Sequence, residues 1–168
     1  MTTGDERDRV VDEPDDEELE KEFMAIMEGI YRNVEKHDQH IVSIPDATPP
    51  FSYTIGNHEC GLPELLLFDL ALSEDTASTI LNRLGRIMRD RRKAFDHGEM
   101  ASLGGKCPVK IIDTSREVKE EFTLFVGVYY GTDDYRVQQV VLCDIEGRFP
   151  GDPDCSEPYA SQLVLAAN

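Results

Sequence analysis

The apolar run from Leu65 to Phe68 is the feature that most constrains how this chain can fold. The run follows a loop-like segment, residues 56–63, and ends at Asp69. A short apolar run without alternation, bounded by loop residues, is typical of a strand that is covered on both faces. The sequence therefore predicts a central strand in a layered domain. The chain of 168 residues is long enough for one such domain with its own core.

Two segments have the apolar spacing of amphipathic helices. The first begins after Pro14, where acids suit the positive end of a helix dipole, and should end near His37. The second begins at Ser73, a good N-cap residue, and should end at His97 and Gly98. Steps of three and four residues give each helix one core-facing stripe. The first stripe comprises Leu19, Phe23, Ile26, Met27, Ile30, Tyr31 and Val34, and the second comprises Ala77, Ile80, Leu81, Leu84, Ile87, Met88 and Phe95.

Five further segments are predicted strands: residues 41–44, 51–55, 108–112, 122–130 and 136–144. Alternation makes residues 51–55 a half-buried strand, and the turn residues 131–134 would join the last two strands as a hairpin. The order of helices and strands predicts an α+β domain, a mostly antiparallel mixed sheet of five to six strands packed by two amphipathic helices.

The domain is expected to have an extension at each end. We predict a disordered acidic tail over residues 1–14, a single α+β domain over residues 15–152, and a C-terminal extension over residues 153–168. The apolar residues 163–165 of that extension could dock on an edge of the sheet.

The chain is strongly acidic, with 34 acids against 17 bases and a formal charge of −17. Residues 1–22 alone hold eleven acids and three bases. Such a field repels nucleic-acid phosphates and anionic membranes, so a basic protein partner is the expected one. The sequence has no secretory leader, which predicts a cytoplasmic protein, and nothing in it indicates a cofactor or an oligomeric state.

The four cysteines, Cys60, Cys107, Cys143 and Cys155, form no Cys-x-x-Cys pair. We expect them to be free thiols and mostly buried, acting as small apolar side chains.

Two acids and one loop are the candidates for chemistry. A carboxylate at Glu64, next to a buried run, must be hydrogen-bonded or must shift its pKa. It is therefore either a structural cap, the favoured interpretation, or a general acid or base, and Asp144 has the same two interpretations. His58 lies in the loop with Glu59 and Cys60, but neighbours in sequence rarely converge on one ion, and no metal site is predicted.

One basic stripe stands out on the second predicted helix: Arg83, Arg86, Arg89 and Lys93. The favoured interpretation is a solvated helix face. Two alternatives are that the acidic residues 5–22 fold back on it, or that it binds a phosphate-bearing ligand or an acidic partner.

Three ordered segments, residues 51–56, 61–65 and 139–150, resemble a bacterial and phage family catalogued as domain of unknown function 4262. The resemblance covers about residues 20–152 and implies a domain boundary but no activity, because the family has no assigned chemistry. The matching positions are Tyr53, Thr54, Gly56, Pro63, Glu64, Gln139, Asp144, Gly147, Phe149 and Pro150. Leu142 and Gly151 stand where the family has aromatic residues.

The matching segments lie at strand ends, where scaffolds mount binding groups. We therefore hypothesise that residues 56–64 and 144–150 meet in space as one site. The ligand-binding candidates are Tyr53, Thr54, Gln139 and Phe149.

Three functions follow, in order of preference. The first is a non-enzymatic binding module for a protein partner. The second is a hydrolase-like enzyme for a small molecule, with Glu64 or Asp144 as the general acid or base and His58 among its orienting groups. The third is an inhibitor whose acidic surface mimics a nucleic acid.

Overall fold

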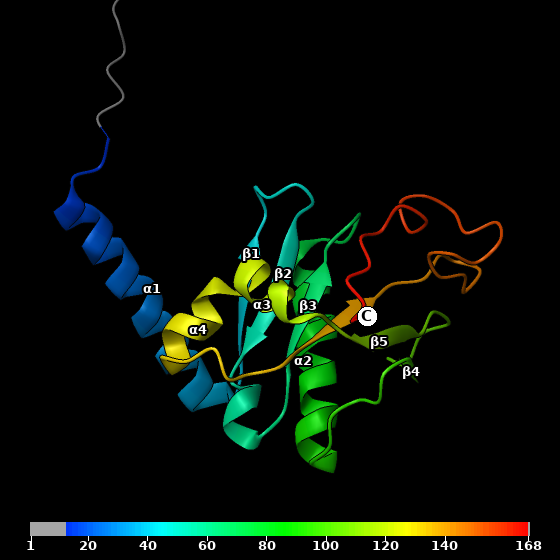
Figure 1. The fold of residues 1–168 in the computed structure, drawn as a ribbon, viewed down its shortest axis with the longest axis horizontal. Helices are drawn as coiled ribbons and strands as arrows, with labels where there is room; N and C mark the ends of the chain where they lie inside the picture. Colours follow the sequence, from blue (N-terminus) through cyan, green and yellow to red (C-terminus); the bar gives the residue numbers. More distant parts are fainter. Residues whose placement is uncertain (1–12, 168) are drawn as a thin grey trace, which may run out of the picture.

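The computed structural model describes residues 13–167 of the chain. These residues form a six-stranded sheet in the order β1-β2-β3-β6-β5-β4 (Figure 1). The strands are β1 (His40–Ile44), β2 (Phe51–Ile55), β3 (Glu64–Phe68), β4 (Glu99–Ala101), β5 (Val109–Asp113) and β6 (Val137–Val141). All neighbouring strands are antiparallel except β3 and β6, which run parallel with Glu64 opposite Val137. The prediction of an α+β fold with a mostly antiparallel mixed sheet is confirmed.

The central strand is β3, as its apolar run predicts, and all four residues from Leu65 to Phe68 are fully buried. Its two faces belong to separate hydrophobic cores. The helix α2 (Glu74–Arg91) packs on one face, and α1 (Asp16–His37), α3 (Arg116–Phe122) and α4 (Leu124–Tyr130) pack on the other (Figure 1). A short 3-10 helix, η1 (Asn57–Cys60), links β2 to β3.

The two long helices begin as predicted, and α1 also ends as predicted. The predicted end of the second helix at His97 and Gly98 is wrong, because α2 ends at Arg91 and Arg92 follows in the left-handed conformation with φ of 55°. The carboxylate of Asp15 accepts from the backbone N–H of Glu18 at the start of α1, which ends at His37. The hydroxyl of Ser73 accepts from the N–H of Thr76 at the start of α2. These caps satisfy backbone donors that have no partner within the helix.

The predicted strand over residues 122–130, and with it the predicted hairpin, is wrong, because this segment forms the end of α3 and all of α4. The β-branched and aromatic residues here resemble a strand in composition. Their spacing is helical, however, since the buried residues Val118 and Val126 are eight positions apart, with the partly buried Phe122 midway between them. Gly131, with φ of 67°, ends α4 in the left-handed conformation that favours glycine.

The strand β2 is buried on both faces rather than half-buried as predicted. Its polar residues Ser52 and Thr54 are fully buried and hydrogen-bonded to carboxylates. The sequence also gave no indication of the short edge strand β4.

The C-terminal extension docks through a side chain of β6. The Gln139 amide donates to Leu163 O over 2.6 Å and accepts from Leu165 N over 2.8 Å. An isolated bridge then pairs Ala166 with Thr114, just beyond β5. The segment 163–165 thus lies against the sheet.

The expectation that all four cysteines are mostly buried is wrong for Cys60 and Cys107, which are exposed. Cys143 is buried, and Cys155 is partly exposed. All four are free thiols.

The predicted disordered tail falls mainly on residues 1–12, outside the described residues. Among residues 13–167, no helix combines the length and hydropathy needed to cross a bilayer.

Candidate functional site

The carboxylate of Glu64 is fully buried at the start of β3 and makes four hydrogen bonds. Its Oε2 accepts from the Thr54 hydroxyl over 2.6 Å. Its Oε1 accepts from the backbone N–H groups of Gly56 and His58, each over 3.0 Å, and from the Tyr130 hydroxyl over 3.2 Å. Glu64 therefore ties the β2–β3 loop and the end of α4 to the sheet.

Burial raises the pKa of Glu64 above its ordinary value, while the hydrogen bonds from Thr54, His58 and Gly56 act to lower it. Both oxygens face donors inside the protein. This arrangement favours the structural interpretation of Glu64 and offers no free oxygen to a substrate.

The Thr54 hydroxyl extends this network toward the loop. Thr54 Oγ1 accepts from Leu65 N over 2.9 Å and from Asn57 Nδ2 over 3.2 Å, so its own hydrogen is left for Glu64. Asn57 is fully buried, and its Nδ2 also donates to Gln39 Oε1 over 3.0 Å. Buried polar side chains thus connect Glu64 to the outer edge of the sheet.

At that edge, the network reaches Arg89 of the basic stripe. Arg89 Nη1 donates to Asn57 Oδ1 over 2.6 Å and to Gln39 Oε1 over 3.1 Å. Arg89 and Arg86 line a polar hollow of about 600 Å³ between the end of α1, β1 and α2. Sequence reasoning found the two arginines through their spacing but missed Asn57 and Gln39, whose partners are distant in sequence.

The other two members of the stripe have separate contacts. Arg83 donates to Leu103 O, and Lys93 lies 3.8 Å from an Asp96 carboxylate oxygen. Residues 16–22, the described helical part of the acidic segment that could have folded onto the stripe, form the first turns of α1, which point away from α2 in Figure 1.

Asp144 lies beyond the end of β6 and is also fully buried. Its Oδ1 accepts from the N–H groups of Glu146 and Arg148 over 3.0 and 2.8 Å, and its Oδ2 accepts from Ser156 N over 2.9 Å. Burial alone would raise the pKa of Asp144, but these backbone donors and the nearby Arg148 guanidinium hold it below its ordinary value.

The hypothesis that residues 56–64 and 144–150 form one site is wrong. Because β3 and β6 are parallel with Glu64 opposite Val137, both strands begin at the same end of the sheet. Asp144 follows the far end of β6, roughly 20 Å away at the rise of an extended strand. The two carboxylates therefore serve separate loops.

The remaining ligand-binding candidates are also distributed. The Tyr53 hydroxyl accepts from Phe125 N over 3.3 Å under α4, and Gln139 holds the C-terminal extension. Phe149 is buried with Lys110 4.4 Å from its ring centre. The His58 ring lies 4.8 Å from that of Tyr130, beside Glu64.

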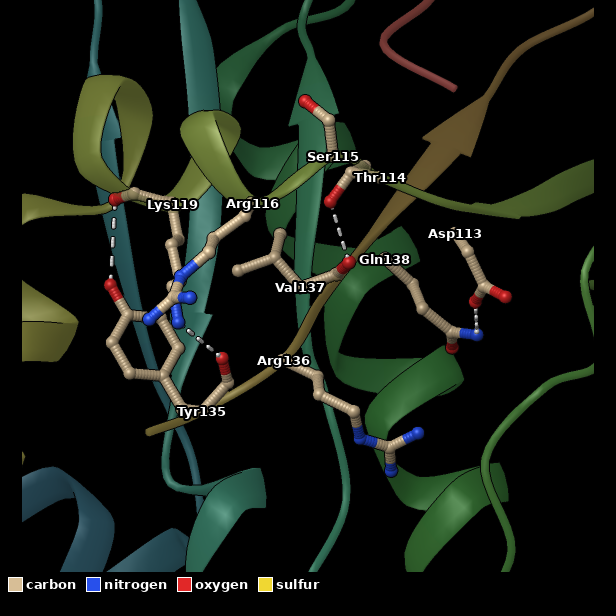
Figure 2. A pocket seen from close by; sticks show the side chains of 9 residues that line it. All are labelled: Asp113, Thr114, Ser115, Arg116, Lys119, Tyr135, Arg136, Val137 and Gln138. Carbon is tan, nitrogen blue, oxygen red and sulfur yellow. Dashed lines mark hydrogen bonds between the residues drawn. The ribbon is translucent and has the colours of Figure 1, made fainter. Parts of the chain in front are cut away.

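A second hollow, of about 300 Å³, lies where β5 leads into α3 and β6 begins (Figure 2). Its three cations are Arg116, Lys119 and Arg136. Lys119 donates to Tyr135 O over 3.3 Å, and Arg116 lies 3.7 Å from an Asp133 carboxylate oxygen. Arg136 donates to Gly61 O over 3.5 Å, so protein groups already engage all three cations.

Gln138 closes one side of this second hollow, with its amide nitrogen bonded to Asp113 over 2.9 Å in Figure 2 and to Phe95 O over 2.7 Å. The Gln138 Oε1 atom is buried and has no hydrogen-bond partner among the described residues.

The apolar stripe of α1 is covered along only half its length. In the second half, Met27, Ile30 and Val34 are buried against the sheet, whereas Tyr31 is 53% exposed and lies against Tyr129 of α4. The preceding part, which we call the exposed α1 stripe, comprises Leu19, Phe23 and Ile26, with 47%, 42% and 48% of their surface exposed. In Figure 1 the first turns of α1 extend past the sheet.

Comparison with known families supports the resemblance seen in the sequence. Residues 33–156 match the family model described as Domain of unknown function (DUF4262). The chain belongs to this family. The match excludes most of α1, and therefore the exposed α1 stripe of this DUF4262 protein. Comparison with curated proteins and with solved structures found no match.

Proposed function

We propose that this DUF4262 protein is a non-enzymatic interaction module that binds a basic, amphipathic segment of a partner protein along α1. The observation that carries the proposal is the exposed α1 stripe, which continues a buried stripe beyond the domain body. Contiguous exposed apolar side chains of this kind mark interaction surfaces. A partner helix or strand bound there would bury the exposed half of the α1 stripe, as the sheet buries the other half.

Side chains of α4 widen this surface. Phe23 stacks on Phe125 with ring centres 6.4 Å apart, which places the two helices side by side. Leu124 and Val128 of α4 are 66% and 41% exposed. The apolar surface therefore spans two helices, as a docking site for an amphipathic segment requires.

Charge determines the kind of partner. Residues 13–28 hold eight acids and a single base, Lys21. Two copies of the chain would bring two such acidic helices together, and like charges would oppose that contact. A segment with basic residues around an apolar stripe is complementary in both respects.

The two other hypothesised functions have less support. A general acid or base needs an oxygen that a substrate can reach, and Glu64 has none exposed. A nucleic-acid mimic needs carboxylates along one ordered face without an apolar centre, whereas the acids of residues 13–28 surround the exposed α1 stripe.

The test is the binding of a fluorescent amphipathic peptide of Lys and Leu in helical spacing, followed by anisotropy at low and moderate salt. The full chain should bind it, and the double variant Phe23→Asp with Ile26→Asp should lose at least about tenfold in affinity, since apolar burial drives the contact. Met100→Asp, at a 47% exposed residue of β4, is the control and should bind like the parent chain.

Circular dichroism checks that each variant is folded. Equal affinity in the double variant and in Met100→Asp would contradict the proposal. So would sedimentation that shows a dimer of the full chain that Phe23→Asp disrupts, because the second copy would then be the occupant.

A further inference from the structure

The polar hollow at the outer edge of the sheet has a local charge opposite to that of the chain. Its polar lining includes Asn33 and His37 of α1 and Ser78, Asn82, Arg86 and Arg89 of α2. Among the described residues that line it there is no carboxylate, in a chain whose net charge is −17. Anions excluded elsewhere on the surface would therefore be favoured here.

Arg89 is fixed at one end of its guanidinium. Both hydrogens of its Nη1 are used, one by Asn57 Oδ1 and one by Gln39 Oε1. The acceptors are rigid, because Asn57 and Gln39 are 0% and 4% exposed and bonded to further groups. Within residues 13–167, no protein group accepts from its Nε or Nη2. This free edge has the geometry that binds two oxygens of one oxyanion.

Gly85 permits this arrangement. A Cβ atom at Gly85 would lie 2.0 Å from Gln39 Oε1 and 2.9 Å from Arg89 Nη1. Glycine is unfavourable in the middle of a helix, so its place in α2 is explained by the close approach of these two side chains. The absence of a side chain at Gly85 thus leaves room for the Gln39 amide, which holds Arg89 in place at the hollow.

We propose that this hollow binds a small phosphate ester with a hydroxylated body, of the sugar-phosphate class. The phosphate would bind the free edge of Arg89 and the guanidinium of Arg86. Asn82 Oδ1 already accepts from Gln39 Nε2, and Asn33 Nδ2 already contacts His40 Nδ1. The Ser78 hydroxyl and the other amide atoms of Asn82 and Asn33 would be the hydrogen-bond partners for hydroxyls of the body. The volume of about 600 Å³ accommodates a ligand of that size.

The hollow in Figure 2 is a weaker candidate for this ligand. There Asp113 lines the wall, and Arg116 and Lys119 already contact protein acceptors. The site at Arg89 is also separate from the exposed α1 stripe, so each proposal can fail without the other.

Calorimetric titration of the full chain tests the site with three probes: ribose 5-phosphate, inorganic phosphate and ribose. Ribose 5-phosphate should bind more tightly than inorganic phosphate, and ribose alone should give no measurable heat. Arg86→Gln should weaken ribose 5-phosphate binding about tenfold or more, because it removes a charged hydrogen-bond donor.

Arg83→Gln is the matched control, since it removes the same charge from α2 one turn earlier and outside the hollow. It should change the affinity by less than about twofold at moderate salt, where distant charges are screened. Equal losses in the two variants, or no binding of ribose 5-phosphate to the parent chain, would overturn the site. Equal affinities for inorganic phosphate and ribose 5-phosphate would overturn the proposal that the site recognises a hydroxylated body.

Discussion

The hydroxyl of Thr54 offers a direct test of whether the Glu64 network stabilises the fold. Thr54→Val keeps the shape of the side chain and removes the hydroxyl. In the structure this leaves Leu65 N and Glu64 Oε2 without the partner they have at 2.9 and 2.6 Å, while Asn57 Nδ2 keeps its bond to Gln39. All the affected groups are in fully buried residues.

Two buried polar groups that lose their partners cost about 1–3 kcal/mol each, so the free energy of unfolding should fall by about 3 kcal/mol or more. Thr54→Ser is the control, because it keeps the hydroxyl and loses one methyl group. Its loss should be about 1 kcal/mol. Urea unfolding followed by far-UV circular dichroism measures both losses in the free energy of unfolding. The two losses are directly comparable if the m-values are unchanged.

The Thr54→Val loss should also depend on pH. The pKa of Glu64 is already raised in the folded chain, and the Thr54 hydrogen bond is one of the contacts that lower it. Removing that bond raises the pKa further, so the folded variant binds its proton more tightly than the unfolded chain over a wider pH range. Stability is then lost as pH rises above the unfolded pKa of Glu64, and more is lost in Thr54→Val than in the parent chain.

The difference between Thr54→Val and the parent chain should therefore be largest near neutral pH and should shrink on acidification, to the part that comes from Leu65 N. A Thr54→Val chain as stable as Thr54→Ser would refute this account of the network. A difference that grew on acidification would refute the assignment of Glu64 as the titrating group.

Four further substitutions test the helices and the core by the same unfolding assay. Gly85→Ala should destabilise the chain by about 1–3 kcal/mol, because its Cβ would displace Gln39 from buried hydrogen bonds. Gly29→Ala is the control: nothing lies within 4 Å of its Cβ, so it should stabilise α1 by about 0.5–1 kcal/mol. A loss of stability in both variants, or a gain in both, would contradict the argument that Gly85 allows a close approach. Ser73→Ala should remove the N-cap of α2 and lower stability by about 1 kcal/mol, and an unchanged urea midpoint would show that the cap is dispensable. Leu81→Ala, at a fully buried residue between α2 and the sheet, should lower it by about 2–5 kcal/mol, and a loss below about 1 kcal/mol would be incompatible with a well-packed core.

The sequence predicts those elements whose buried residues can be recognised from the apolar spacing within one segment. The run Leu65–Phe68 and the stripes of α1 and α2 each identify a buried surface from spacing alone. The composition of residues 122–130 predicts a strand, but the four-residue spacing of their apolar side chains is that of the helix that the structure shows.

The candidate site was less predictable because its contacts are distant in sequence. Arg89 meets Gln39 and Asn57 across 50 and 32 residues, and neither pairing leaves a trace in the spacing of either segment. One signal was available: Gly85 lies in the interior of an otherwise helical pattern, which indicates a close approach by another group. The parallel pairing of β3 and β6, which separates Glu64 from Asp144, likewise depends on the whole topology.

The similar surroundings of Glu64 and Asp144 explain how two matching segments can lie at opposite ends of the sheet. Each is a buried carboxylate that accepts from two or more backbone N–H groups of an adjoining loop. Each carboxylate holds its own loop in place and so acts as an anchor for the fold. The presence of both in segments that match the family therefore does not require that they bind one ligand together. The anchor at Glu64 continues, through Thr54 and Asn57, to Arg89 in the polar hollow, whereas the anchor at Asp144 contacts a different hollow through Ser156. A ligand at Arg89 should therefore protect the Glu64 end of the sheet from amide hydrogen exchange more than the Asp144 end. Equal protection at the two ends would show that the network does not connect Glu64 to the hollow.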